Sequence, residues 1–109
     1  MTARRVVEYL EQGGISPFGR WFGGLDPIAA AKVTTALYRL EQGNISNVKA
    51  VGKGVAEYRI DFGPGYRIYF GQDGKALVIL LGGGTKKGQS ADIHRAQMRW
   101  QQFKAGKKR

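Results

Sequence analysis

Two neighbouring segments alternate polar and apolar residues with a period of two, and no other feature limits the possible folds of this chain as strongly. They are residues 57–62 (EYRIDF) and 66–70 (YRIYF), separated by a GPG turn at residues 63–65. Because successive side chains of a strand point to opposite faces of a sheet, the pattern predicts a β-hairpin with one apolar face. That face needs a covering layer, which the rest of the chain must supply.

Two more strands are predicted from the flanking sequence. Residues 76–81 (ALVILL) form a continuous apolar run, bounded by a DG turn signal at residues 73–74 and by three glycines at residues 82–84. Such a run is typical of a strand buried on both faces, so we expect it inside the sheet. Residues 4–10 mix Val and Tyr with charged residues and predict a first strand. Residues 44–55 show no sustained period and predict a connection.

Three segments carry the apolar spacing of helices, in which residues three and four apart share a face. The first begins at Ser16 and is limited by nearby glycines to about two turns. The second covers residues 28–42 and ends at Gly43, a residue type that favours the end of a helix. The third begins between Lys87 and Ser90 and presents apolar residues on one side and cations on the other.

Together these segments predict an α+β fold: a small antiparallel β-sheet with two N-terminal helices packed on it and a C-terminal helix. We expect one domain over residues 1–104 and a basic tail over residues 105–109, since no repeat or low-complexity tract marks another boundary. The apolar runs are far shorter than the roughly 20 residues that a bilayer requires, and the absence of Cys fits a reducing compartment. A cytoplasmic protein without membrane association is expected.

The charge is strongly positive and unevenly distributed. The 109 residues include 18 Lys and Arg against 8 Asp and Glu, and residues 85–109 alone carry +7 of the net charge of +10. A basic surface favours polyanions, so nucleic acid or an acidic protein is the expected partner, although the tail alone could serve only solubility. One His and no Cys leave no support for a metal site, and we expect neither a metal nor a small-molecule cofactor.

The polar face of the hairpin carries the most concentrated candidate chemistry. With a three-residue turn, Asp61 lies opposite Arg67 and Arg59 lies opposite Tyr69, which makes the two arginines diagonal neighbours. Two guanidiniums this close suit a phosphodiester, whose oxygens match their fork geometry. Lys86 follows the three glycines and could project over the sheet edge. An ordinary surface ion pair between Asp61 and Arg67 explains part of this pattern equally well.

The hairpin segments, the run VILLGGGTKK at residues 78–87 and the following Asp92 and Ile93 resemble the RelE/ParE superfamily of bacterial toxins, in particular the HigB-like addiction-module killer proteins. The resemblance extends from the first strand to about Phe103. It implies the toxin component of a type II toxin-antitoxin system, with a cognate antitoxin as partner. In the ribosome-dependent members, basic residues surround an mRNA phosphate and assist attack by the 2′-hydroxyl on the adjacent phosphorus.

The resemblance also implies which residues would carry the reaction. Arg67 takes the place of the hairpin arginine of the family, Arg59 that of a basic residue on the preceding strand, and Lys86 that of a basic residue beyond the glycines. Their charges would stabilise the pentavalent phosphorus without a metal ion.

The general base is left open by the sequence, because relatives carry other residues at the corresponding positions. Asp61 and Asp92 are candidates, His94 is a weaker one, and a lysine of lowered pKa is a fourth possibility, among Lys49, Lys53 and Lys86. Further RNA contacts are expected from five other cations and from one tyrosine. We expect this tyrosine, Tyr69, on the surface. The cations are Lys49, Lys53, Lys87, Arg95 and Arg99.

Three functions are compatible with these features. The preferred one is a metal-independent endoribonuclease that cuts mRNA on the ribosome and so inhibits translation. The second is a non-enzymatic toxin of the ParE type that inhibits DNA gyrase and needs no converging catalytic groups. The third is a basic nucleic-acid-binding module, in which residues 104–109 would dominate the affinity.

Overall fold

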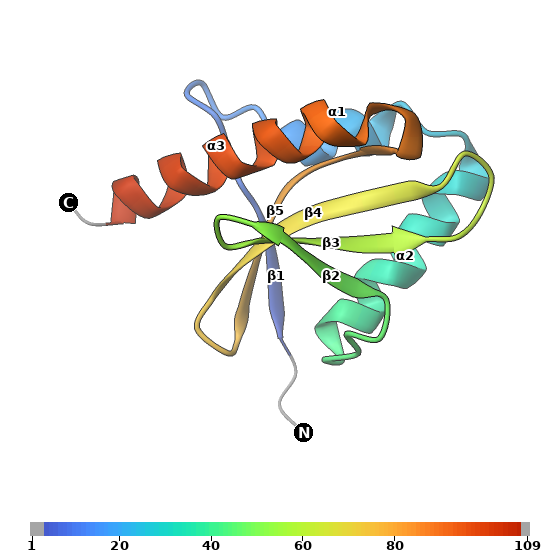
Figure 1. Cartoon of the computed structure of the whole chain (residues 1–109), viewed down its shortest axis with the longest axis horizontal. Coiled ribbons are helices and arrows are strands. Elements are labelled where there is room, and N and C mark those ends of the chain that lie inside the picture. Colours follow the sequence, from blue (N-terminus) through green and yellow to red (C-terminus); the bar gives the residue numbers. More distant parts are fainter. Residues whose placement is uncertain (1–3, 108–109) are drawn as a thin grey trace.

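The computed structural model describes residues 4–107 of the chain, with side chains through residue 106. Within these residues the elements follow one another as shown in Figure 1: β1 (Arg5–Glu8), α1 (Pro17–Gly23), α2 (Pro27–Glu41), β2 (Val48–Gly52), β3 (Val55–Ile60), β4 (Tyr66–Asp73), β5 (Leu77–Thr85), the 3-10 turn η1 (Lys86–Gly88) and α3 (Gln89–Lys107). Both N-terminal helices begin with a proline that directly follows the N-cap residue, which is Ser16 for α1 and Asp26 for α2.

The five strands form one sheet in the order β1-β5-β4-β3-β2. The predicted α+β class and the interior position of the apolar strand β5 are confirmed. Strands β3, β4 and β5 are antiparallel as expected, and β2 also pairs antiparallel with β3. Strand β1 runs parallel to β5, so the sheet is mixed and not wholly antiparallel as predicted. No tight turn joins β1 to β5, so the direction of this pair is not fixed by a hairpin.

Strand β2 lies within residues 44–55, which the sequence predicted to be a connection, and that prediction is wrong. Its five residues are partly or fully exposed, so no apolar period marks them. The strand is held by its pairing with β3, and the turn between them places Gly52, Lys53 and Gly54 at positive φ. An edge strand of this kind depends on backbone hydrogen bonds more than on side-chain pattern.

Helices cover both faces of the sheet. On one face α1 and α2 pack against β3, β4 and β5, with Phe18, Val33 and Leu40 over Ile68 and Phe70. We call the other side the α3 face; there Ala96 and Trp100 of α3 pack on β3, β4 and β5. Figure 1 shows α3 running across the strands as a separate layer from α2. No helix within residues 4–107 is long and apolar enough to span a bilayer.

The register of the central hairpin differs from the expected one. Arg59 lies directly opposite Arg67, and the connecting loop has five residues, 61–65, in place of three. Asp61 therefore belongs to the loop and does not face Arg67. The longer loop lets Gly63 and Gly65 adopt φ values of 56° and 78°, which glycine tolerates best. Both registers bury the same apolar residues of β3 and β4, so the sequence period could not distinguish them.

Three further expectations change with the structure. Phe62, which the alternating pattern of residues 57–62 places on the apolar face, is 38% exposed in the hairpin loop. Tyr69, expected on the surface, is buried on the α3 face because α3 packs over it. Helix α3 continues to Lys107, so residues 105–107 of the predicted tail are helical, and residues 108–109 lie outside the described part of the chain.

Candidate functional site

A fully buried carboxylate lies at the centre of the polar part of the α3 face. Glu57 of β3 accepts a hydrogen bond of 2.9 Å from Nε of Arg59 and forms an ion pair, 3.5 Å from its Oε1, with Nε of Arg67. Nε2 of Gln89, the first residue of α3, donates to both oxygens at 2.9 and 3.2 Å. Strand alternation places Glu57 and Arg59 on one face, and strand pairing brings Arg67 opposite.

This arrangement explains how two arginines can lie opposite one another across a strand pair. Like charges in that position repel, and the carboxylate of Glu57 between Arg59 and Arg67 offsets the repulsion. A buried carboxylate is tolerated only where charges and hydrogen bonds replace its water, as the two guanidiniums and Gln89 do here. One negative charge faces two positive ones, so the group keeps a net positive charge.

The backbone of the hairpin loop joins Arg67 to Lys86. The carbonyl oxygen of Gly65 accepts hydrogen bonds from Nη1 of Arg67 at 2.7 Å and from the backbone N–H of Lys86 at 2.9 Å. A Cβ at position 65 would lie 3.0 Å from Nη1 of Arg67, so glycine gives the guanidinium its room. Arg59, Arg67 and Lys86, called the cation cluster below, thus come together at one end of the sheet.

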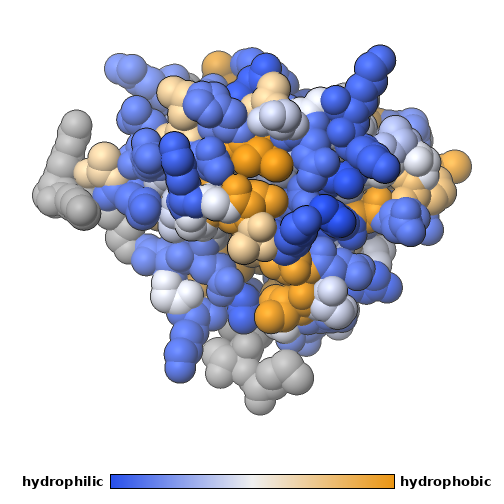
Figure 2. All heavy atoms as spheres, viewed as in Figure 1, coloured by the Kyte–Doolittle hydropathy of each residue, from blue (hydrophilic) through white to orange (hydrophobic). Residues whose placement is uncertain are grey.

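Solvent reaches the members of the cation cluster to different extents. The side chain of Arg59 is 45% exposed and that of Arg67 only 9%, whereas Lys86 is exposed in η1. The view in Figure 2 shows a mainly hydrophilic surface interrupted by small apolar patches. An anion approaching the cluster would therefore meet Arg59 and Lys86 first, with Arg67 behind them.

Asp92, in the first turn of α3, is the acidic candidate that packs on the strand residue next to Arg67. Its carboxylate packs against Gly84 so closely that a Cβ there would have no room, and Gly84 is the strand partner of Arg67. Burial raises the pKa of Asp92, while Arg95, whose Nη1 donates to Asp92 at 3.0 Å, and Arg99 act in the opposite direction. Asp61 has no such position.

Tyr69 cannot serve as a base-stacking platform in this structure. It is 1% exposed, and its hydroxyl has no hydrogen-bond partner among the described residues. Burial, with smaller contributions from Glu57 and Asp92, raises the pKa of Tyr69 well above its usual value. The predicted nucleobase contact by Tyr69 is therefore withdrawn.

The predicted RNA-contacting lysines fall into two places. Lys49 lies on β2 directly opposite Glu57, and Lys87 follows Lys86 in η1, so both are exposed near the cation cluster. Lys53 occupies the β2–β3 turn, at the opposite end of β3 from Arg59. The structure brings Lys49 and Lys87 to the site and leaves Lys53 apart from it.

The two arginines of α3 predicted to contact RNA, Arg95 and Arg99, border a cleft of about 200 Å³ between α1 and α3. Arg99 donates from Nη1 to the carbonyl of Leu81 at 3.0 Å and lies 3.8 Å from Glu11, whereas Arg95 is more exposed. Arg20 of α1, which the sequence did not single out, lines the same cleft. Three arginines and Asp92 thus line one cleft between α1 and α3.

Sequence reasoning missed the two residues that organise the site. Glu57 had a usable signal, because it precedes Arg59 by two positions on an alternating strand and must share its face. Gln89 had none, since it lies 32 residues away in sequence and meets Glu57 only through the packing of α3. No cluster of three or more Asp, Glu or His side chains that could hold a metal ion occurs within residues 4–107.

Comparisons with known proteins agree with this architecture. The family model described as "Phage derived protein Gp49-like (DUF891)" matches residues 20–101, from α1 into α3. A Haemophilus influenzae (strain Rd) protein described as uncharacterized is 42% identical over 82 residues, covering 74% of this chain and 83% of that protein. The family is related to RelE/HigB-like toxins, so the resemblance to this broad group of toxins is confirmed. The specific HigB-like group stays a prediction.

Replacing the buried carboxylate tests whether it holds the site together. Glu57→Gln leaves two guanidiniums without their counter-charge, so we expect the free energy of unfolding to fall by about 3 kcal/mol. This is the lower end of the range for breaking a buried ion pair, because the side chain of Arg59 is half exposed. The measurement is urea denaturation followed by circular dichroism. Glu41→Gln, at an exposed position, serves as the control and should change stability by less than about 0.5 kcal/mol. Equal losses in both variants would contradict the assigned role of Glu57.

Proposed function

We propose, from the premise that this chain belongs to the Gp49-like family, that it is the toxin component of a type II toxin-antitoxin system and cuts mRNA on the ribosome. The observation that carries the proposal is the cation cluster. Its three residues come from β3, from β4 and from the segment after β5: Glu57 joins the guanidiniums of Arg59 and Arg67, and the carbonyl of Gly65 joins Arg67 to the backbone of Lys86. A single phosphate is the kind of group that such a convergence recognises.

The proposed reaction is phosphodiester cleavage by the neighbouring ribose. The 2′-hydroxyl oxygen attacks the phosphorus, its proton passes to the carboxylate of Asp92, and the bond from phosphorus to the 5′ oxygen breaks. The products are a 2′,3′-cyclic phosphate and a 5′-hydroxyl, whose oxygen takes a proton from solvent. Arg59 and Lys86 stabilise the extra negative charge of the pentavalent phosphorus, with Arg67 behind them.

Asp92 is the preferred general base for two reasons. It packs against the strand partner of Arg67, whereas Asp61 lies in the hairpin loop and lines the cleft beside α2. Its pKa is raised by burial, and a base with a higher pKa accepts a proton more readily at neutral pH. Glu57 is not a candidate base, because its oxygens already accept from Arg59 and Gln89 and pair with Arg67.

The partial burial of the cluster supports the proposed dependence on the ribosome. A free, flexible RNA would find only Arg59 and Lys86 well exposed, and binding it would carry the full entropic cost of orienting the scissile bond. A ribosome that already holds the mRNA in place removes much of that cost. The proposed setting is accordingly the bacterial cytoplasm, with mRNA and ribosome as partners.

The proposed antitoxin would bind the same exposed cations. A protein of net charge +10 attracts an acidic partner, and covering Arg59 and Lys86 would block access to Arg67. Neutralisation would then require only one contact surface.

Removing the exposed lysine of the cluster tests the proposed activity without disturbing the buried pairs. Lys86→Ala should reduce mRNA cleavage by at least about tenfold, because one of the charges that stabilise the transition state is lost. The measurement is growth after induction in bacteria, together with a map of new mRNA 5′ ends relative to the reading frame. Lys75→Ala, an exposed lysine in the β4–β5 turn, is the control and should leave both unchanged.

The same experiment separates the alternative functions. Cuts that recur at a fixed position in the codon are the expected result for the wild-type chain. Growth arrest with altered DNA supercoiling and no cuts would favour a gyrase inhibitor instead. Full cutting by Lys86→Ala would show that the cation cluster does not act on the phosphate.

The pH dependence of cleavage distinguishes the two carboxylates that are candidates for the general base, Asp92 and Asp61. Asp92 accepts a proton only when ionised, so the rate should rise with pH through its pKa, which burial holds above the reference value of 3.8. Asp92→Asn should lower the rate about 100-fold and abolish this rise. The measurement is cleavage on purified translating ribosomes across acidic pH. Asp61→Asn should keep the wild-type profile, and loss of the acid limb in that variant would assign the base to Asp61.

A further inference from the structure

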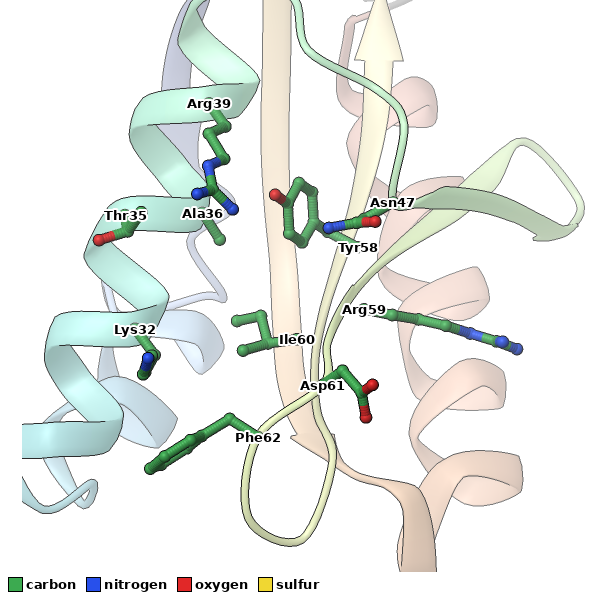
Figure 3. Close-up of a pocket in the computed structure, with 10 residues that line it drawn as sticks. All are labelled: Lys32, Thr35, Ala36, Arg39, Asn47, Tyr58, Arg59, Ile60, Asp61 and Phe62. Carbon is green, nitrogen blue, oxygen red and sulfur yellow. The ribbon is translucent and has the colours of Figure 1, made fainter.

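A second polar cleft, of about 260 Å³, opens between α2 and the end of β3. Figure 3 shows Tyr58, Ile60 and Phe62 pointing toward α2, while the side chain of Arg59 points away on the other side of the strand. The cleft therefore lies on the face of β3 opposite the cation cluster. None of the functions considered above makes use of it.

Two cations on α2 border this cleft without an acidic partner. Lys32 and Arg39 are seven residues apart, so they share one side of the helix about 10 Å from each other along its axis. Both are exposed, and within residues 4–107 neither forms an ion pair. Asp61 is the single acidic residue lining the cleft, so the charge there is positive. The lining favours an anionic ligand.

An exposed aromatic ring stands at one end of the cleft. Phe62 is 38% exposed, and the ammonium of Lys32 lies 4.9 Å from its ring centroid. Stacking of a nucleobase on an aromatic ring is stronger than a cation–π contact at an exposed site. A base could therefore replace the ammonium over Phe62, which would free Lys32 to contact a phosphate.

The other end of the cleft offers hydrogen-bonding groups. Figure 3 shows the side-chain amide of Asn47 beside the ring of Tyr58, with the guanidinium of Arg39 extending from α2 toward them. An amide carries donors and an acceptor, which is what the edges of a base require. Cations, an aromatic platform and an amide within one small cleft match a nucleotide better than an acidic peptide, which has no planar group to stack.

The cleft meets the cation cluster at the outer edge of β3, near the hairpin loop. Strand β2 begins at Val48, opposite Tyr58, and the backbone N–H of Arg59 donates to the carbonyl of Asn47 at 3.1 Å, so the pairing along this edge ends at Arg59. Arg59 helps to line the cleft, while its side chain pairs with Glu57 on the α3 face. Arg59 therefore links the two sites.

We infer that this cleft binds one nucleotide of the RNA substrate away from the bond that is cut. Its base stacks on Phe62, and its phosphates contact Lys32 and Arg39. The inference rests on the proposed RNA substrate, but it concerns binding and not cleavage. It gives the protein a second RNA contact on the α2 side of β3, where Phe62, Lys32 and Arg39 are not members of the cation cluster.

The test is binding of a short, fluorescein-labelled single-stranded RNA whose 2′-O-methyl riboses prevent cleavage, followed by fluorescence anisotropy at low salt. Phe62→Ala and Phe62→Leu should each weaken binding about fivefold or more, because both lose the stacking surface, and Phe62→Tyr should restore it. Tyr38→Ala, an exposed aromatic of α2 outside the cleft, is the matched control and should bind as the wild type.

The cations are tested through the salt dependence of the same binding. Arg39→Ala should reduce the slope of log affinity against log salt by about 0.7, the value for one lost phosphate contact to a single strand, whereas Lys75→Ala should not. Equal RNA affinities of Phe62→Ala and Tyr38→Ala would overturn the inference. Equal salt slopes of Arg39→Ala and Lys75→Ala would overturn it as well. So would tighter binding of a polyglutamate peptide that is lost in Arg39→Ala, since it would assign the cleft to an acidic protein.

The two proposals fail in different ways. If no mRNA is cut but the variants still differ in RNA binding, the proposed nuclease function is wrong and the proposed nucleotide site stands. Frame-locked cuts without the binding differences would keep the nuclease and remove the cleft.

Discussion

The charge on Glu57 is the constraint on which the polar half of this protein depends. It lies between two arginines that strand pairing places directly opposite each other, and it is sealed from water by the first residue of α3. The same carboxylate therefore stabilises the hairpin, helps to fix the start of α3 and orients the guanidiniums. A buried ion pair contributes little net stability compared with apolar packing, so its value here lies in the geometry that it imposes.

The sheet separates two tasks between its two faces. The face under α1 and α2 holds the larger apolar core, with a polar cleft only at its α2 margin, whereas the α3 face combines apolar packing around Trp100 with the charged group around Glu57. Glycines make this combination possible, because Gly65 leaves space for Arg67 and Gly84 leaves space for Asp92. The glycine triplet, which the sequence predicted to end the strand, lies within β5: Gly82 and Gly84 leave room for side chains of α3, and Gly83 leaves room for Trp21 of α1.

The sequence predicted the elements better than their relative positions. Periodicity located the helices and the central hairpin, and the apolar run placed β5 inside the sheet. The hairpin register could not be predicted, because a shift by two residues keeps Tyr58 and Ile60 on the same face. The burial of Tyr69 and the contact of Gln89 with Glu57 depend on where α3 packs, which no local pattern encodes. The alternating hairpin and the glycine triplet singled out Arg59, Arg67 and Lys86, and the family resemblance supplied their expected roles.

The central claim is that RNA binds through the arginines that Glu57 holds, and nuclear magnetic resonance of the arginine Nε–Hε groups tests it most directly. Adding single-stranded 2′-O-methyl RNA to the labelled protein should shift the signals of Arg59 and Arg67 together, at concentrations where the signal of exposed Arg5 does not move. Unchanged signals from Arg59 and Arg67, with shifts confined to other basic residues, would contradict it.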